Sequence, residues 1–277
     1  MLRNFFLNIA LCNSLHVSTI NFPFDRGSNQ RGSDYSPEVI HRSLNFLNPV
    51  ENITIATSKR DHLRTVLSDG YFKTRDIVDR GIFPVIIGGD HTISASTISA
   101  CNDVAIINQE RLGVLWFSAF ADFNTIQTST TGNLHGITVS ILCKHTLPML
   151  SLGNGLEPEQ FGFIGLRDLD SREFNRFTEY NMRIIDSDNE NDLHEWLKMF
   201  DQVYISISLD VLDPLEFNLV NCPVPDGLSS TTLINIIKQI KSLKKIMALD
   251  IVEFNPLKGE NTSIIIDIIK SAITPNL

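Results

Sequence analysis

Short apolar runs alternate along the chain with longer stretches in which apolar residues recur at helical spacing. Continuous apolar runs of about 4–8 residues are typical of strands buried on both faces, and intervening helices are typical of a parallel sheet. The pattern predicts strands at 17–22, 83–87, 112–117, 162–165, 182–185, 202–209 and 246–252. It predicts helices at 37–47, 61–80, 134–143, 191–200, 230–240 and 261–273. We therefore expect an α/β fold, a three-layer α/β/α sandwich with a mostly parallel sheet.

The composition describes a folded chain without an obvious internal boundary. Hydrophobic residues make up 43% and charged residues 20%, a balance that excludes intrinsic disorder. No linker rich in Pro, Gly or Ser divides the sequence and no repeat is visible, so we expect one domain over residues 1–277. Apolar runs such as 85–87 and 264–266 are far shorter than the roughly 20 residues of a membrane-spanning helix. We expect no membrane partner.

Charge and cysteine content narrow the class further. The chain has 23 Lys and Arg against 32 Asp and Glu, a net charge of −9, whereas a nucleic-acid binder presents a basic surface. Its four cysteines are far apart and show no zinc-binding spacing, which favours reduced thiols and a cytoplasmic location. The first twelve residues could be read as a weak signal peptide, but we favour a segment leading into the first strand.

Acidic and imidazole side chains follow several of the predicted strands. Ligands of open parallel sheets bind at the carboxyl ends of the strands, so these residues are candidates for one site. The segments are Gly88-Gly89-Asp90-His91, then 118–124, 166–170, 208–214 and 249–253. The sequence therefore predicts a polar ligand site at the carboxyl edge of the sheet.

The same segments occur in an order that resembles a known family. Seven segments are similar to the arginase branch of the ureohydrolase superfamily. They are Gly88-Gly89-Asp90-His91, 118–125, 131–136, 208–214 and 249–256, with the loops at 27–37 and 227–229. The resemblance implies an arginase-like fold, two bound Mn²⁺ ions, and hydrolysis of a guanidinium or amidine group. It also implies assembly into trimers or hexamers, so a homo-oligomer or a related subunit is an expected partner.

The six manganese-ligand positions implied by the resemblance are only half filled. They fall on His91, Ser118, Phe120, Asp122, Ser208 and Asp210. By the resemblance, positions 118 and 208 carry the carboxylates that bridge the two ions, and position 120 carries the second ion's only imidazole. A neutral hydroxyl is a poor ligand for Mn²⁺ and a phenyl ring is none. Only His91, Asp122 and Asp210 remain as ligands, so we expect no cofactor and no arginine hydrolysis.

The resemblance also assigns roles to residues around the metal positions. It places Asn124, Thr131 and Asn133 at the α-carboxylate of an amino-acid substrate, Asp170 and Glu173 at its α-ammonium group, and Ser229 near the substrate head. It assigns catalytic roles to Glu253, which would hold the guanidinium group, and His135, which would shuttle a proton. Structural roles stay open for several of these residues, because Asn orders loops and a carboxylate is favourable at a helix N-terminus.

Three hypotheses for the function follow. The leading one is a protein with the arginase fold that lacks the manganese pair and binds or senses a small amino acid or guanidino compound. The alternative is a divergent hydrolase of the arginase, agmatinase or formimidoylglutamase type, which would use Mn²⁺ through one ion or a shifted ligand set. The third is a scaffold that contributes only contacts within an oligomer.

Overall fold

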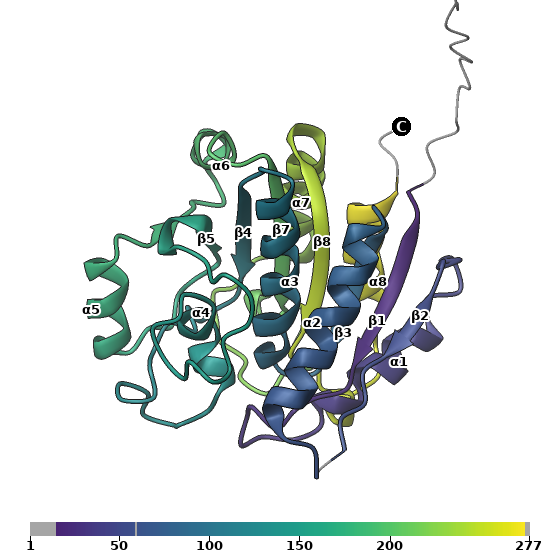
Figure 1. The fold of residues 1–277 in the computed structure, drawn as a ribbon, viewed down its shortest axis with the longest axis horizontal. Helices are drawn as coiled ribbons and strands as arrows, with labels where there is room; N and C mark the ends of the chain where they lie inside the picture. Colours follow the sequence, from purple (N-terminus) through teal and green to yellow (C-terminus); the bar gives the residue numbers. More distant parts are fainter. Residues whose placement is uncertain (1–14, 59, 275–277) are drawn as a thin grey trace, which may run out of the picture.

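The computed structural model describes residues 15–58 and 60–274 of the 277-residue chain. One sheet of eight parallel strands runs through its centre, in the order β2-β1-β3-β8-β7-β4-β5-β6 (Figure 1). The strands are β1 Val17–Phe22, β2 Asn52–Thr54, β3 Phe83–Gly88, β4 Leu112–Phe117, β5 Phe161–Ile164, β6 Arg183–Ile184, β7 Gln202–Ser208 and β8 Lys245–Val252. The predicted α/β sandwich is confirmed, and the sheet is parallel throughout.

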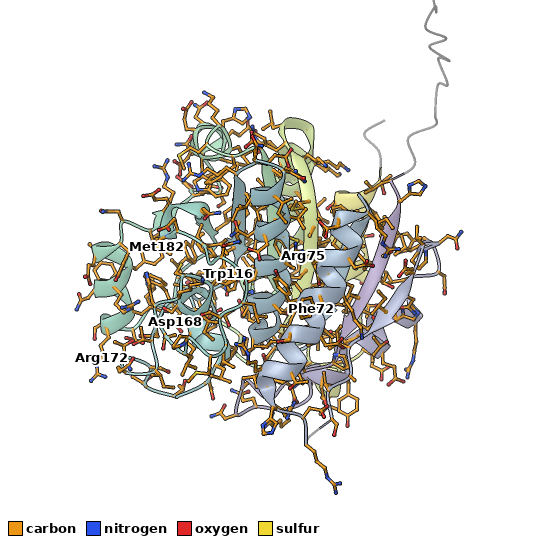
Figure 2. All side chains as sticks on the ribbon, in the orientation of Figure 1. Phe72, Arg75, Trp116, Asp168, Arg172 and Met182 are labelled. Carbon is orange, nitrogen blue, oxygen red and sulfur yellow. The ribbon has the colours of Figure 1, made fainter. Side chains whose placement is uncertain are left out.

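Helices cover both faces of the sheet. They are α1 Ser36–Arg42, α2 Leu63–Asp79, α3 Ser94–Ile107, α4 Thr138–Leu142, α5 Ser171–Glu179, α6 Glu190–Leu197, α7 Ser230–Leu243 and α8 Ser263–Ile273. In Figure 1, α2 and α3 cross in front of the sheet, and α7 and α8 lie behind it. Side chains fill the space between the layers (Figure 2).

Two apolar clusters, one on each face, hold the three layers together. Along β4, Val114 and Trp116 belong to the cluster under α2 and α3, whereas Leu115 and Phe117 belong to the cluster under α7 and α8. Successive side chains of a strand point to opposite faces, so a strand that is apolar at every position contributes to both clusters. This explains why the strands read as continuous apolar runs in the sequence.

The strand order brings the ends of distant segments together. β3 and β4 follow each other among the strands of the chain, yet β8 and β7 lie between them in the sheet. The loops that follow these four strands therefore meet at the middle of the carboxyl edge. In open α/β sheets, this is where a crevice opens for a ligand.

The predicted ranges missed three elements, α3, α5 and β2. α5 is short and has only Glu173 and Phe177 buried, so it shows little apolar periodicity. α3 is buried on nearly all sides, so it lacks the polar face whose alternation marks a surface helix. β2 has only three residues and two of them are exposed, so it carries no apolar run.

Two predicted helices are shorter than expected. The one predicted at 134–143 starts as a 3₁₀ turn, His135–Ile137, before α4, and the one predicted at 37–47 ends at Arg42. After Arg42 the chain continues in turns, with the Ser43 hydroxyl hydrogen-bonded to the Thr262 hydroxyl on a distant segment. A contact of this kind, with a partner far along the chain, cannot be read from local periodicity.

Residues 1–14 lie outside the described part of the chain, and with them the segment that could be read as a signal peptide. Within residues 15–58 and 60–274, no helix combines the length and apolar character needed to cross a membrane.

Candidate functional site

A cavity of about 390 Å³ lies at the carboxyl edge of the sheet, lined by residues that follow β1, β3, β4, β5, β7 and β8. Its acidic residues are Asp122, Asp168, Asp170, Glu173, Asp210 and Glu253. No lysine or arginine of the described residues lines it. Figure 2 shows one of these acids, Asp168, toward the side of the molecule where α4 and α5 lie. The predicted site residues therefore lie around a strongly acidic cavity.

The Gly-Gly-Asp-His segment fixes the loop after β1 against the end of β3. A Cβ atom on Gly89 would lie 1.9 Å from the carbonyl oxygen of Phe24, so only glycine allows this close approach. The Asp90 carboxylate accepts hydrogen bonds from the backbone N–H groups of Gly27 (2.6 Å) and Thr92 (3.0 Å). Burial, and then the charge on Glu253, raises the pKa of Asp90 to about 7.

His91 is held on three sides at the floor of the cavity. Its ring stacks on Trp116 with centroids 3.8 Å apart, and its Nδ1 lies 3.1 Å from Asp122 Oδ2. Its Nε2 lies 2.9 Å from the Ser206 hydroxyl, which itself donates to Asp250. Since that hydroxyl proton is used, Ser206 accepts from Nε2–H, and the 3.1 Å contact of Nδ1 with Asp122 Oδ2 requires one proton shared between these two atoms. Burial lowers the pKa of His91. Burial also raises the pKa of Asp122 to about 7, although the charge of His135 lowers it.

The order Asp122, His91, Ser206 resembles that of a hydrolytic triad, but the geometry excludes a nucleophilic serine. Ser206 has no exposed surface, and its hydroxyl is directed to Asp250 Oδ1 at 2.7 Å. Asp250 also accepts hydrogen bonds from the hydroxyls of Ser94 and Tyr204. This network supports His91 from behind and offers no atom that could attack a ligand.

Asp210 is held by both serines that stand at the bridging positions. Its Oδ1 accepts from the Ser118 hydroxyl (3.0 Å) and the Ala119 N–H (2.9 Å), and its Oδ2 accepts from the Ser208 hydroxyl. Burial raises the pKa of Asp210 to about 6, although the hydrogen bonds from Ser208 and Ala119 lower it. Both oxygens of the carboxylate are therefore occupied by donors of the protein itself.

The described residues do not offer a ligand set for a metal ion. No group of three or more His, Cys, Asp or Glu side chains within residues 15–58 and 60–274 is arranged to hold one. Phe120, at the position where the resemblance implies an imidazole, contributes its ring to the cavity lining. The three remaining ligand candidates fall into separate contacts, with His91 paired to Asp122 and Asp210 bound by hydroxyls.

His135 and Glu253 form a buried ion pair on the cavity wall. His135 Nδ1 lies 3.1 Å from Glu253 Oε1, which also accepts from the His91 N–H. Burial lowers the pKa of His135, but the charge and hydrogen bond of Glu253 outweigh it and raise that pKa to about 10. Burial also opposes ionisation of Glu253, yet His135 holds its pKa below the usual value.

Two cavity residues have a left-handed backbone. Asp122 has a φ of 50° and Glu253 a φ of 67°. Such conformations cost about 1–3 kcal/mol each in non-glycine residues and persist where the surroundings impose them. Both carboxylates are thus placed by loop geometry that the rest of the fold maintains.

The residues predicted at the ammonium end of a substrate do reach the cavity. Asn124 Nδ2 donates to Asp170 Oδ2 at 2.8 Å, and the other Asp170 oxygen caps α5 by accepting from the N–H groups of Arg172 and Glu173. Glu173 Oε1 accepts from the N–H groups of Phe123 and Asn124. Burial, and then the charge on Asp122, raises the pKa of Glu173 to about 8.

The remaining predicted binding residues are divided. Thr131 and Asn133 line the cavity, and Asn133 is paired with Asn29 of the 27–37 loop through its side-chain oxygen and nitrogen. Ser229 does not line the cavity; its hydroxyl accepts from the Thr232 N–H and caps α7. The structure therefore brings the predicted site residues together except Ser229.

Some lining residues were not predicted as site residues. Asn29 and Gln30 belong to the 27–37 loop, and Asp168 follows β5, so the family resemblance and the strand-end rule both contained a signal for them. Cys222 had no such signal. It lies on a loop whose path over the cavity depends on tertiary contacts alone.

An all-parallel sheet covered on both faces, with an acidic cavity at its carboxyl edge, defines an α/β protein of the open-sheet class. The chain belongs to the arginase family, whose family model matches residues 15–273. It is 30% identical to the arginase of Bacillus caldovelox, over 88% of this chain and 92% of the relative.

Solved structures agree with this family assignment. The Bacillus subtilis arginase superposes with a TM-score of 0.83 at 25% identity, over 95% of this chain and 99% of the other. The Entamoeba histolytica arginase, solved in complex with L-ornithine, superposes with a TM-score of 0.80 at 22% identity, over 95% of this chain and 100% of the other. The latter likeness supports the fold alone.

Proposed function

We propose that this member of the arginase family does not hold the manganese pair, does not hydrolyse arginine, and acts as a small-molecule-binding or regulatory protein. The observation that carries the proposal is the pair of hydroxyls from Ser118 and Ser208, both of which donate to Asp210. The family resemblance implies bridging carboxylates at these two positions.

The chemistry of the site supports loss of the metal. With carboxylates at 118 and 208, four acids would converge, and each close pair would repel by about 3–4 kcal/mol at an effective dielectric near 20 unless cations lay between them. The two serines remove that repulsion and satisfy Asp210 instead. A hydroxide able to attack a guanidinium carbon at neutral pH requires metal ions that lower the pKa of bound water.

The cavity supports a binding role. It is large enough for a small organic ligand, it is strongly acidic, and His135 and Glu253 stay paired on its wall. Six acidic side chains and no lysine or arginine of the described residues line it, which favours a cation. We propose that the ligand of this chain is a small cationic compound.

A metal-dependent hydrolase of a guanidino or amidine compound is the second candidate. It is favoured by the 30% identity to a protein named arginase over most of the chain, and by the approach of His135 to Glu253 at 3.1 Å. Under this hypothesis, one Mn²⁺ or a shifted set of acids would replace the missing ligands.

Metal content and urea release separate the two candidates. The protein is purified with Mn²⁺ present, and bound manganese and urea formed from L-arginine are measured beside the Bacillus caldovelox arginase as a positive control. We expect well under one manganese per chain and no urea. Two ions per chain, or turnover comparable to the control, would establish the hydrolase instead.

A further inference from the structure

Three buried carboxylates of the cavity each keep one oxygen without a protein donor. Asp122, Glu173 and Glu253 are 6%, 5% and 5% exposed, and all three line the cavity. His91 contacts one oxygen of Asp122. The N–H groups of Phe123 and Asn124 donate to one oxygen of Glu173. The His91 N–H and the His135 ring engage one oxygen of Glu253. The other oxygens, Asp122 Oδ1, Glu173 Oε2 and Glu253 Oε2, have no hydrogen-bond partner among the described residues. These oxygens are accessible and can accept hydrogen bonds, so the cavity is suited to a ligand with several N–H groups.

An aromatic face lies in the same acidic cavity. Phe120 lines it two residues before Asp122, and its ring takes part in no ring–ring or cation–ring contact within the described part of the chain. A phenyl ring attracts an ammonium or guanidinium group through the negative face of its π-system, more strongly when water is excluded. Phe120 and Asp122 therefore offer a π face and a carboxylate to the same cavity, at positions where the family resemblance implies manganese ligands.

The two amides that the resemblance places at a ligand carboxylate are already engaged. The amide of Asn124 donates to Asp170 and accepts from the Thr128 hydroxyl, and the amide of Asn133 is paired with Asn29. Without a lysine or arginine among the described lining residues, a carboxylate would face six acids. Its burial beside like charges is unfavourable.

We propose that the cavity binds a linear dication without a carboxylate, an α,ω-diamine, with one ammonium group on the ring of Phe120 beside Asp122. The second ammonium group meets the free oxygen of Glu173 nearer the rim. This assignment rests on the proposed function, because a cation can occupy the floor only where the manganese pair does not.

Putrescine and L-ornithine make a matched pair of probes, since they share two amines and differ by one carboxylate. A third probe, n-butylamine, has one amine only and tests the need for the second ammonium group. Binding is measured by calorimetry in metal-free buffer, and by the emission of Trp116 in a Trp196→Phe background. Trp116 stacks on His91, which contacts Asp122, so its emission reports on this end of the cavity. We expect putrescine to bind about tenfold more tightly than either other compound.

Two substitutions test the cation subsite. Phe120→Leu keeps an apolar side chain but removes the π face, and Asp122→Asn keeps a residue type that adopts a positive φ readily. Each should weaken putrescine binding about tenfold or more without loss of the folded state in a thermal melt. Phe72→Leu, at an exposed position on α2, is the matched control and should bind as the wild type does (Figure 2).

Unchanged putrescine affinity in Phe120→Leu would overturn the proposal, as would tighter binding of L-ornithine than of putrescine or no binding of putrescine at all. These outcomes are distinguishable from failure of the proposed function. That function fails on manganese content and urea release, which the putrescine titration does not measure.

Discussion

At the residue scale, the surroundings of Asp210 show how a buried charge is accommodated without a metal. The carboxylate is 4% exposed and receives hydrogen bonds from two hydroxyls and one backbone N–H. A buried carboxylate without donors costs several kcal/mol, whereas one with satisfied oxygens is tolerated. Ser118 and Ser208 are therefore structural supports of Asp210 in this chain.

Removal of both hydroxyls should destabilise the fold. Ser118→Ala with Ser208→Ala leaves Asp210 with the Ala119 N–H as its one remaining donor among the described residues, and we expect the free energy of unfolding to fall by about 1–3 kcal/mol. Urea denaturation measures the change. The exposed Ser242→Ala on α7 is the control and should alter stability by less than about 0.5 kcal/mol. Equal stability of the double variant and the control would contradict a supporting role.

At the element scale, one arginine joins the loops that follow β5 and β7. Arg167 donates through its guanidinium to the backbone carbonyls of Gly165, Asp210, Val224 and Pro225. Burial lowers the pKa of Arg167, against the charge of Asp210. A planar fork of donors can satisfy several carbonyls at once, which a lysine ammonium on a flexible stem cannot do with the same geometry.

Arg167→Lys should loosen the 209–228 segment while the sheet stays folded. The backbone N–H groups of Asp213 and Leu228 bond across this segment, so they are the reporters. We expect their hydrogen exchange to speed up about tenfold or more, the equivalent of losing about 1.5 kcal/mol of local stability. Arg172→Lys, exposed on α5, is the control and should leave the two rates unchanged (Figure 2). Uniform acceleration across β3 and β4 would instead indicate global destabilisation.

At the scale of the whole molecule, the backbone frame and the metal chemistry are separable. The fold superposes on the Bacillus subtilis arginase over 95% of the chain, while three of the six positions that the resemblance assigns to ligands carry serine or phenylalanine. If the frame is intact, side chains alone prevent metal binding. Restoring them then becomes a test of the residue-by-residue assignment.

Ser118→Asp with Ser208→Asp should restore Mn²⁺ binding to at least one site, because His91 and Asp122 would supply the other ligands. Without metal, the converging carboxylates repel and the melting temperature should fall below that of the wild type. With Mn²⁺ it should rise again, since a ligand at 100 times its Kd stabilises by about 2.7 kcal/mol. Addition of Phe120→His should be required for a second ion. Activity should lag behind binding, because a catalytic site must be held within about 0.5 Å.

Thermal melts with and without Mn²⁺ report both effects, and elemental analysis counts the ions. Ser242→Asp on the exposed side of α7 controls for an added surface charge and should show no response to Mn²⁺. If the triple variant binds no manganese and melts identically in both conditions, the loops differ from those of the metal-binding relatives.

Much of this site could be predicted from the sequence because it follows a local rule. Polar residues directly after buried apolar strands identify Asp90, His91, Asp122 and Asp210, and the structure places each of them at the carboxyl edge. Ser229, which only the family resemblance assigned to the site, shows the limit of reasoning from sequence position. It has the expected position in the sequence, yet its hydroxyl caps α7 and does not line the cavity.

The sequence by itself determined every strand except β2, the α/β class and the residues that follow those strands, because periodicity and strand-end position are local properties of the chain. Only the tertiary structure decided which of those residues touch. β4 and β7 pair with Phe117 opposite Ile207, so Ser118 and Ser208, 90 residues apart in the chain, both reach Asp210. That contact depends on the register between two distant strands, which is set by packing of the whole sheet against its helices.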